Sequence, residues 1–312
     1  MTSMAAETFT VKASSDGLTL EGLITRPQDN TSTKGNVKGI LQISHGMCEH
    51  KERYIPFMEF MSANDFVCII HDHRGHGASV KTSADLGFMY KGGWEAMVND
   101  VRIVTDCIKS QYPGVPVYLL GHSMGSMVAR SYAKRYDDCI EKLIVSGCPT
   151  DNPAKGAGKL LARIFALIKG DHFRPQLLQN MSFGAFNKPF EKEGPNAWVC
   201  SDKDILKAYN EDPLCQYIFT ANGFANLMGV MGDCYSRKGW QMKNNRMPIL
   251  FLSGADDPCK ASVKAFDSAV ELMRKVGYED VNSRLYPGMR HEILNETDRQ
   301  TVWNDVLDFV SR

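Results

Sequence analysis

The chain has 312 residues, of which 43% are hydrophobic and 23% are charged, as in an ordinary globular protein. Lys and Arg number 36 together, and so do Asp and Glu, so no net field favours nucleic acid as a partner. No apolar run approaches the roughly 20 residues of a membrane-spanning helix.

The N-terminal residues and the cysteines indicate the cellular compartment of the protein. The first residues, MTSMAAETFTVKASSDG, lack a basic segment followed by an apolar run, as a secretory signal would have. Nine cysteines are scattered along the chain without a C-x-x-C pair, which is typical of free thiols in a reducing environment. We therefore expect a cytoplasmic protein.

Short β-rich runs bounded by Gly, Pro or Asn alternate with longer stretches of helical periodicity. The predicted strands are residues 8–14, 18–27, 39–46, 66–73, 116–122, 142–147, 248–254 and 282–288. The predicted helices are residues 54–65, 95–113, 125–137, 262–277 and 301–312. This alternation predicts an α/β fold with a mostly parallel central sheet and helices on both faces. The first two strands should form an antiparallel hairpin at its edge.

The alternation stops between about Thr150 and Arg246, where the pattern is helical and loop-like. A strongly strand-like run follows directly, so the sheet resumes after this stretch. We therefore predict a helical cap formed by residues 150–246, inserted into a core formed by residues 1–149 and 247–312.

A serine lies between two glycines where a predicted strand ends and a predicted helix begins. Residues 121–125 read Gly-His-Ser-Met-Gly and match the G-x-S-x-G nucleophile elbow, whose tight backbone presents the serine oxygen above the sheet edge. The N–H groups that open the helix face the same point. Ser123 is therefore the predicted nucleophile.

A serine hydroxyl needs a histidine base to take its proton and an acid to orient that histidine. In enzymes with this elbow the acid follows the serine along the chain, and the histidine follows the acid. Asp256 and Asp257 come just after one predicted strand, and His291 follows the next. Either aspartate fits by position. Backbone N–H groups should stabilise the oxyanion, and the candidates are Met124, after the nucleophile, and Met47, after the strand at 39–46.

Five segments in order resemble one family. They are HGMCEHKERY, HDHRGHGAS, GHSMGS, SGADDP and YPGMRHEILNE, spanning residues 45–296. The chain resembles the monoacylglycerol lipases and bacterial lysophospholipases of the α/β-hydrolases, often called serine aminopeptidase-type hydrolases. The resemblance implies an α/β-hydrolase fold, and it implies Asp257 as the acid, because the family's acid lies three residues after the glycine at 254.

The family's HG-x-x-EH-x-x-RY pattern falls on residues 45–54 and borders the alcohol-binding end of the pocket in relatives. The resemblance thus suggests that Glu49 and Arg53 face a glycerol-like head group. Their spacing of four residues also fits a structural ion pair. Both interpretations stay open from the sequence.

The resemblance implies a carboxylic-ester hydrolase that forms an acyl-enzyme without a cofactor or metal and acts on monoacylglycerols or lysophospholipids. One alternative is an esterase for short-chain or aromatic esters of the feruloyl type. An alternative of another class is a non-catalytic ligand-binding protein that reuses the fold.

One stretch of the cap has the pattern of a basic amphipathic helix. Its apolar face holds Leu160, Leu161, Ile164, Phe165 and Ile168, and its basic residues are Lys155, Lys159 and Arg163. Such a helix can rest on a lipid surface, which would give the protein a peripheral membrane contact. Its apolar face can instead cover the active-site cleft.

A histidine cluster in HDHRGHG calls for a metal test. His71, His73 and His76 have an H-x-H-x-x-H spacing, but the aspartate that zinc hydrolases of this kind carry before the last histidine is Gly75 here. We therefore interpret the segment as a loop that Asp72 and Arg74 hold structurally.

Overall fold

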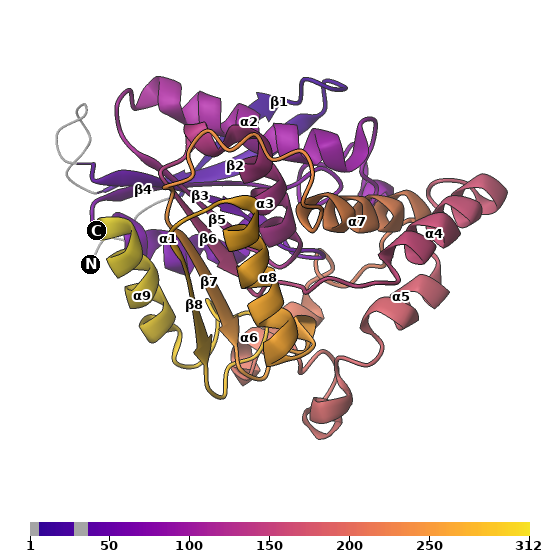
Figure 1. Ribbon diagram of the computed structural model, residues 1–312. Helices are drawn as coiled ribbons and strands as arrows, with labels where there is room; N and C mark the ends of the chain where they lie inside the picture. Colours follow the sequence, from indigo (N-terminus) through magenta and orange to yellow (C-terminus); the bar gives the residue numbers. More distant parts are fainter. Residues whose placement is uncertain (1–5, 28–36) are drawn as a thin grey trace.

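The computed structural model describes residues 6–27 and 37–312 (Figure 1). In this part of the chain eight strands form one sheet in the order β1-β2-β4-β3-β5-β6-β7-β8. The strands are β1 (Glu7–Lys12), β2 (Thr19–Thr25), β3 (Gly39–Ser44), β4 (Phe66–His71), β5 (Val117–His122), β6 (Lys142–Ser146), β7 (Ile249–Gly254) and β8 (Val281–Tyr286).

The sheet is parallel from β4 across to β8. Strand β2 pairs antiparallel with β4, and β1 pairs antiparallel with β2 as the outermost hairpin. The predicted α/β sheet with an edge hairpin is therefore confirmed. Because the parallel strands share one direction, the loops after β3, β5, β7 and β8 emerge at the same edge.

Helices cover both faces of the sheet. Their bounds are α1 (Ile55–Ser62), α2 (Gly93–Gln111), α3 (Met124–Tyr136), α8 (Val263–Val276) and α9 (Arg299–Ser311). The buried side chains of α2, α3 and α8 pack on one face and those of α1 and α9 on the other. Successive side chains of a strand point to opposite faces of the sheet. In β5, Val117 and Leu119 therefore pack toward α2, α3 and α8, and Tyr118 and Leu120 pack toward α1 and α9.

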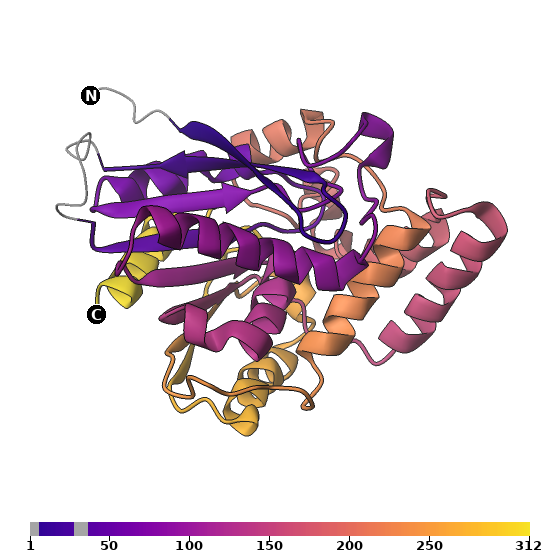
Figure 2. The same cartoon turned by 90° about the horizontal axis from the view of Figure 1, so that it is seen from above.

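The stretch between β6 and β7, all of which is described, contains helices and no strand. Its helices are α4 (Lys155–Lys169), α5 (Gln176–Phe183), the 3₁₀ helix η4 (Lys188–Glu193), α6 (Lys203–Glu211) and α7 (Ala221–Cys234). Helix α7 packs against α2, α3 and α4. Figure 2 shows α4, α5 and α7 beyond the end of the sheet toward which the β4 arrow points. No helix in residues 6–27 and 37–312 combines the length and apolar character needed to cross a membrane.

Candidate active site

Ser123 lies in a sharp turn between β5 and α3. Its backbone has φ 51° and ψ −119°, a region that side-chain-bearing residues rarely adopt and that stores strain. The two flanking glycines are required by close packing. A Cβ on Gly121 would lie 2.4 Å from the carbonyl oxygen of Gly125, and one on Gly125 would lie 2.0 Å from that of Ser44.

Three side chains from separate loops form a continuous hydrogen-bond chain. His291 Nε2 is 2.8 Å from Ser123 Oγ, and His291 Nδ1 is 3.0 Å from Asp257 Oδ2. The Asp257 carboxylate also accepts the Cys259 N–H at 2.8 Å and the Ser253 hydroxyl at 3.1 Å. The structure therefore brings together the serine, histidine and aspartate that the sequence indicated.

The two candidate aspartates have different environments. Asp257 is 1% exposed and faces the imidazole, whereas Asp256 is exposed to solvent. Burial alone would raise the pKa of Asp257, but the His291 ring lowers it below its usual value. Burial alone would likewise lower the pKa of His291, and the Asp257 carboxylate raises it well above its usual value. The two groups thus stabilise each other's charged forms.

The loop after β3 lies directly against the serine. A Cβ placed on Gly46 would come within 3.0 Å of the Ser123 Cβ, so this loop approaches the nucleophile as closely as a glycine allows. The next residue is Met47, and Met124 opens α3 on the other side of the serine. Both candidate oxyanion residues are therefore neighbours of the Ser123 turn.

Glu49 and Arg53 belong to a buried network. The Arg53 guanidinium contacts Glu49 at 3.4 Å and binds both carboxylate oxygens of Glu292, with Nη2 to Oε2 at 2.6 Å. Glu49 also accepts the Gly46 N–H and, at 3.0 Å, the Tyr54 hydroxyl. The ion pair expected from their spacing is thus present, and it extends to the residue after His291.

The two carboxylates of this network titrate differently. Burial and the nearby charge of Glu292 raise the pKa of Glu49 to about 7. Burial would also raise the pKa of Glu292, but its paired contact with Arg53 lowers it. The Arg53 guanidinium, although it contacts both acids, therefore stabilises the charged form of Glu292 more than that of Glu49.

Sequence reasoning missed Glu292 as the partner of Arg53, and it assigned nothing to Trp198 or His122. The rings of Trp198 and His122 lie 5.1 and 4.8 Å from that of His291. Because Glu292 directly follows the predicted base His291, its position in the sequence could have marked it as a residue of the site. Trp198 comes from the stretch between β6 and β7, and no pattern in the sequence linked it to His291.

The loop that carries His291 is held by the stretch between β6 and β7. The Glu292 N–H donates to the Val199 carbonyl at 2.8 Å, and Arg290 binds the Ala197 carbonyl at 2.6 Å and the Glu193 carboxylate at 2.7 Å. The position of the base thus depends on contacts with this inserted stretch.

The HDHRGHG segment is anchored by its aspartate and arginine side chains. Asp72 accepts hydrogen bonds from Lys51 and from the Ala78 N–H, and Arg74 pairs with the Asp100 carboxylate at 2.7 Å. This confirms that Asp72 and Arg74 hold the loop. Two groups of potential metal ligands occur among the described residues, and neither includes the three histidines at 71, 73 and 76: one is Asp257, Cys259 and His291, and the other is His50, Asp212 and Cys215.

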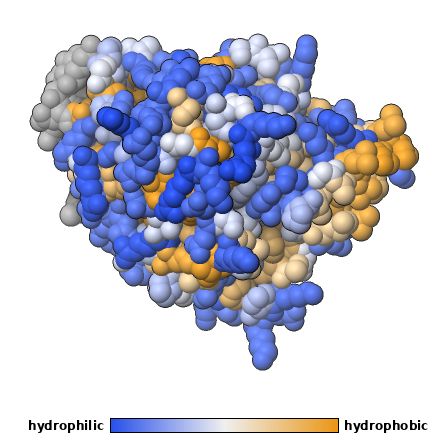
Figure 3. All heavy atoms as spheres, viewed as in Figure 1, coloured by the Kyte–Doolittle hydropathy of each residue, from blue (hydrophilic) through white to orange (hydrophobic). Residues whose placement is uncertain are grey.

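Helices α4 and α5 carry apolar side chains on the molecular surface. The exposed ones are Leu160, Ile164, Leu167, Ile168, Leu177 and Met181. Figure 3 shows the corresponding hydrophobic patch at the right edge, where Figure 1 places α4 and α5. Leu161 and Phe165 instead pack against the core. The predicted amphipathic helix therefore turns part of its apolar face inward and leaves part of it in solvent.

The chain is similar in sequence to known hydrolases. The family model described as serine aminopeptidase, S33 matches residues 35–298. The monoacylglycerol lipase of Mycolicibacterium smegmatis is 26% identical over 273 residues, covering 88% of each chain. The monoglyceride lipase homologue of monkeypox virus is 30% identical over 285 residues, covering 88% of this chain and 89% of the viral one.

Two solved structures have the same fold. A thermostable carboxyl esterase from Bacillus coagulans, in complex with glycerol, superposes with a TM-score of 0.88 at 24% identity, covering 98% of both chains. A soluble variant of the Saccharomyces cerevisiae monoglyceride lipase superposes with a TM-score of 0.71 at 20% identity, covering 99% of this chain and 96% of that one. The chain belongs to the serine aminopeptidase S33 family of hydrolases, has the α/β-hydrolase fold, and counts monoacylglycerol lipases among its relatives.

Proposed function

We propose that this hydrolase cleaves carboxylic esters through a covalent acyl-enzyme. The hydrogen-bond chain from Ser123 through His291 to Asp257 carries the proposal. Ser123 Oγ attacks the ester carbonyl while His291 Nε2 takes its proton and then gives it to the leaving alcohol. Asp257 stabilises the imidazolium. Water activated by the same histidine then releases the acid and restores the serine.

The oxyanion of each tetrahedral intermediate would be held by the backbone N–H groups of Met47 and Met124. The close approach of Gly46 to Ser123 supports this assignment. We assign Glu49 and Arg53 a positioning role, because Glu49 accepts the Gly46 N–H and Arg53 joins Glu49 to Glu292 beside the base. The network thus connects the oxyanion loop with the loop of the base.

We further propose that residues 150–246 form a cap over a core of residues 1–149 and 247–312. The contacts of Trp198, Val199 and Glu193 with the His291 loop support this division. The exposed apolar side chains of α4 and α5 favour contact with a lipid surface over burial against the core.

Monoacylglycerols or lysophospholipids are the proposed substrates. Two observations support them: the exposed apolar surface of α4 and α5, and the monoacylglycerol lipases among the relatives. Glycerol esters with one acyl chain combine a polar alcohol with a long apolar tail, which suits a buried polar network near the base and an apolar surface beyond it.

A hydrolysis panel combined with active-site labelling tests the proposal. The panel holds monoacylglycerols of graded chain length, lysophosphatidylcholine, a feruloyl ester and short p-nitrophenyl esters. We expect stoichiometric fluorophosphonate labelling at Ser123 and the highest kcat/KM on a lipid ester. A preference for the feruloyl ester would establish the aromatic esterase instead. Failure of the folded protein to label would establish a non-catalytic binding protein.

A further inference from the structure

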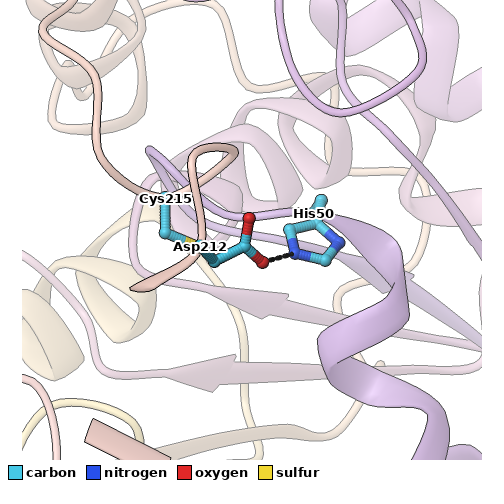
Figure 4. Close-up of side chains that lie close together, drawn as sticks. All are labelled: His50, Asp212 and Cys215. Atoms are coloured by element: carbon cyan, nitrogen blue, oxygen red, sulfur yellow. Dashed lines mark hydrogen bonds and ion pairs between the residues drawn. The ribbon is translucent and has the colours of Figure 1, made fainter. Parts of the chain in front are cut away.

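A second cluster of reactive side chains, formed by His50, Asp212 and Cys215, is not used by the proposed chemistry (Figure 4). The ligand atoms of the three residues all lie within 4.8 Å of one another. His50 and Cys215 are buried, and Asp212 is partly exposed. Figure 4 shows the Asp212 carboxylate directed at the His50 ring, with Cys215 beside it.

His50 is held from both sides by carboxylates. Its Nδ1 is 2.6 Å from Glu52 Oε2, and its Nε2 is 2.7 Å from Asp212 Oδ2. Both ring nitrogens therefore donate protons in this arrangement. In zinc sites the imidazole commonly uses one nitrogen for the metal and gives the other N–H to a carboxylate, which fixes the ring. Glu52 already occupies that supporting position, and Nε2 faces the Asp212 carboxylate, with the Cys215 ligand atom within 4.8 Å.

The chemical types of the three candidate ligands indicate which metal ion would bind. Imidazole, thiolate and carboxylate are the ligand types of Zn²⁺, while a sulfur ligand disfavours Mg²⁺ and Ca²⁺. Two tetrahedral zinc bonds of about 2.0 to 2.1 Å place their ligand atoms about 3.3 Å apart, which is farther than the 2.7 Å between His50 Nε2 and Asp212 Oδ2. A side-chain rotation of the partly exposed Asp212 can open this space for the ion and leave a fourth position for water.

We propose that His50, Asp212 and Cys215 form a Zn²⁺ site, with Glu52 orienting the imidazole. Binding replaces the proton on His50 Nε2 and the proton on Cys215 Sγ, and both are released to solvent as the metal bonds form. His50 follows the loop of Gly46 and Met47, and Asp212 and Cys215 lie in the stretch between β6 and β7. The ion thus ties that stretch to the loop beside Ser123.

Co²⁺ and Zn²⁺ titrations of the full chain, freed of metal with a chelator, test the site. Tetrahedral Co²⁺ with a thiolate ligand should give a sulfur-to-metal charge-transfer band with one equivalent of Co²⁺, and Zn²⁺ should remove it. We expect Cys215→Ser to abolish the band. Glu52→Gln should weaken Zn²⁺ binding by about 10- to 100-fold, as measured by competition with a chromophoric chelator.

The other Asp, Cys and His cluster supplies the matched control. Cys259 lies 3.9 Å from His291 Nε2, so Cys259→Ser removes the sulfur of the cluster at the active site. The proposal requires the band to survive in Cys259→Ser. Loss of the band in Cys259→Ser, or no stoichiometric band in the wild-type chain, would overturn it. If Cys215→Ser does not fold, Asp212→Asn decides instead: unchanged Zn²⁺ affinity in that variant also overturns the site.

Discussion

The sheet region and the stretch between β6 and β7 place their apolar side chains differently. Every residue of β3, β4 and β5 is buried, whereas Leu167 of α4 is 87% exposed and Ile168 is 70% exposed. Burying a leucine or isoleucine stabilises a fold by about 1.5 to 3 kcal/mol. Internal packing therefore explains the apolar residues of the sheet and does not explain the exposed apolar residues of α4. The proposed function accordingly assigns the reactive groups to the sheet region and lipid contact to α4 and α5.

The largest effect should come from Ser123→Ala in the sheet region. Without Oγ there is no nucleophile for His291 to activate, so kcat should fall by about 10⁵- to 10⁶-fold on soluble and on aggregated esters alike. Hydrolysis of a short p-nitrophenyl ester and of a monoacylglycerol emulsion measures it, with circular dichroism as the folding control. A loss confined to the emulsion would contradict the division of roles.

The next largest effect separates the two aspartates. Asp257→Asn should lower kcat by about 10³- to 10⁴-fold, while Asp256→Asn, at the exposed neighbour, should stay within about threefold of wild type. Equal losses in the two variants would contradict the geometry around His291. Steady-state kinetics of both purified variants at saturating ester measures this difference.

Asp257→Asn should also shift the dependence of kcat/KM on pH. The base must be neutral, so wild-type activity is lost as pH falls through the His291 pKa, which Asp257 holds well above its usual value. Removing the carboxylate lowers that pKa. The acidic limb of the Asp257→Asn profile should therefore move to lower pH, and kcat/KM measured against pH shows the shift. A move to higher pH would contradict it.

A smaller effect decides the role of the network between the two loops. Glu292→Gln weakens the paired contact with Arg53, and breaking a buried pair costs stability. If Arg53 positions the oxyanion loop and the base, kcat should fall about 10-fold on every ester with KM nearly unchanged. A rise in KM restricted to glycerol esters would instead establish an alcohol-binding role. Arg53→Lys, which keeps the charge and loses the paired contact, should reproduce the kcat loss.

An effect on binding alone, with no effect on catalysis, is expected in the stretch between β6 and β7. The double substitution Leu167→Ser with Ile168→Ser should lower binding to phosphatidylglycerol vesicles about 10-fold, because it removes two exposed apolar side chains from α4. Hydrolysis of a soluble short-chain ester should be unchanged. Vesicle sedimentation measures the binding. Val263→Ser is the matched control, because Val263 is an exposed apolar residue of α8 in the sheet region. Equal losses in both variants would remove the special role of α4.

Much of the fold could be predicted because its signals are local. Strand alternation and helical periodicity depend on neighbouring residues, and the residues around Ser123 predicted a turn that the structure shows at φ 51°. The exposure of Leu167 and Ile168 could not be predicted. An amphipathic pattern states that one face is apolar but does not state what covers it.

By itself, the sequence determined the order and type of the elements and the short list of reactive residues, because local chemistry and spacing suffice for both. Position along the chain left Asp256 and Asp257 open, and the family resemblance favoured Asp257, which the structure places against the imidazole. Only the tertiary structure decided that Arg53 meets Glu292 across 239 positions and that His50 meets Asp212 across 162. These contacts depend on how loops from separate strands converge at one edge of the sheet, and residue spacing along the chain does not encode that convergence.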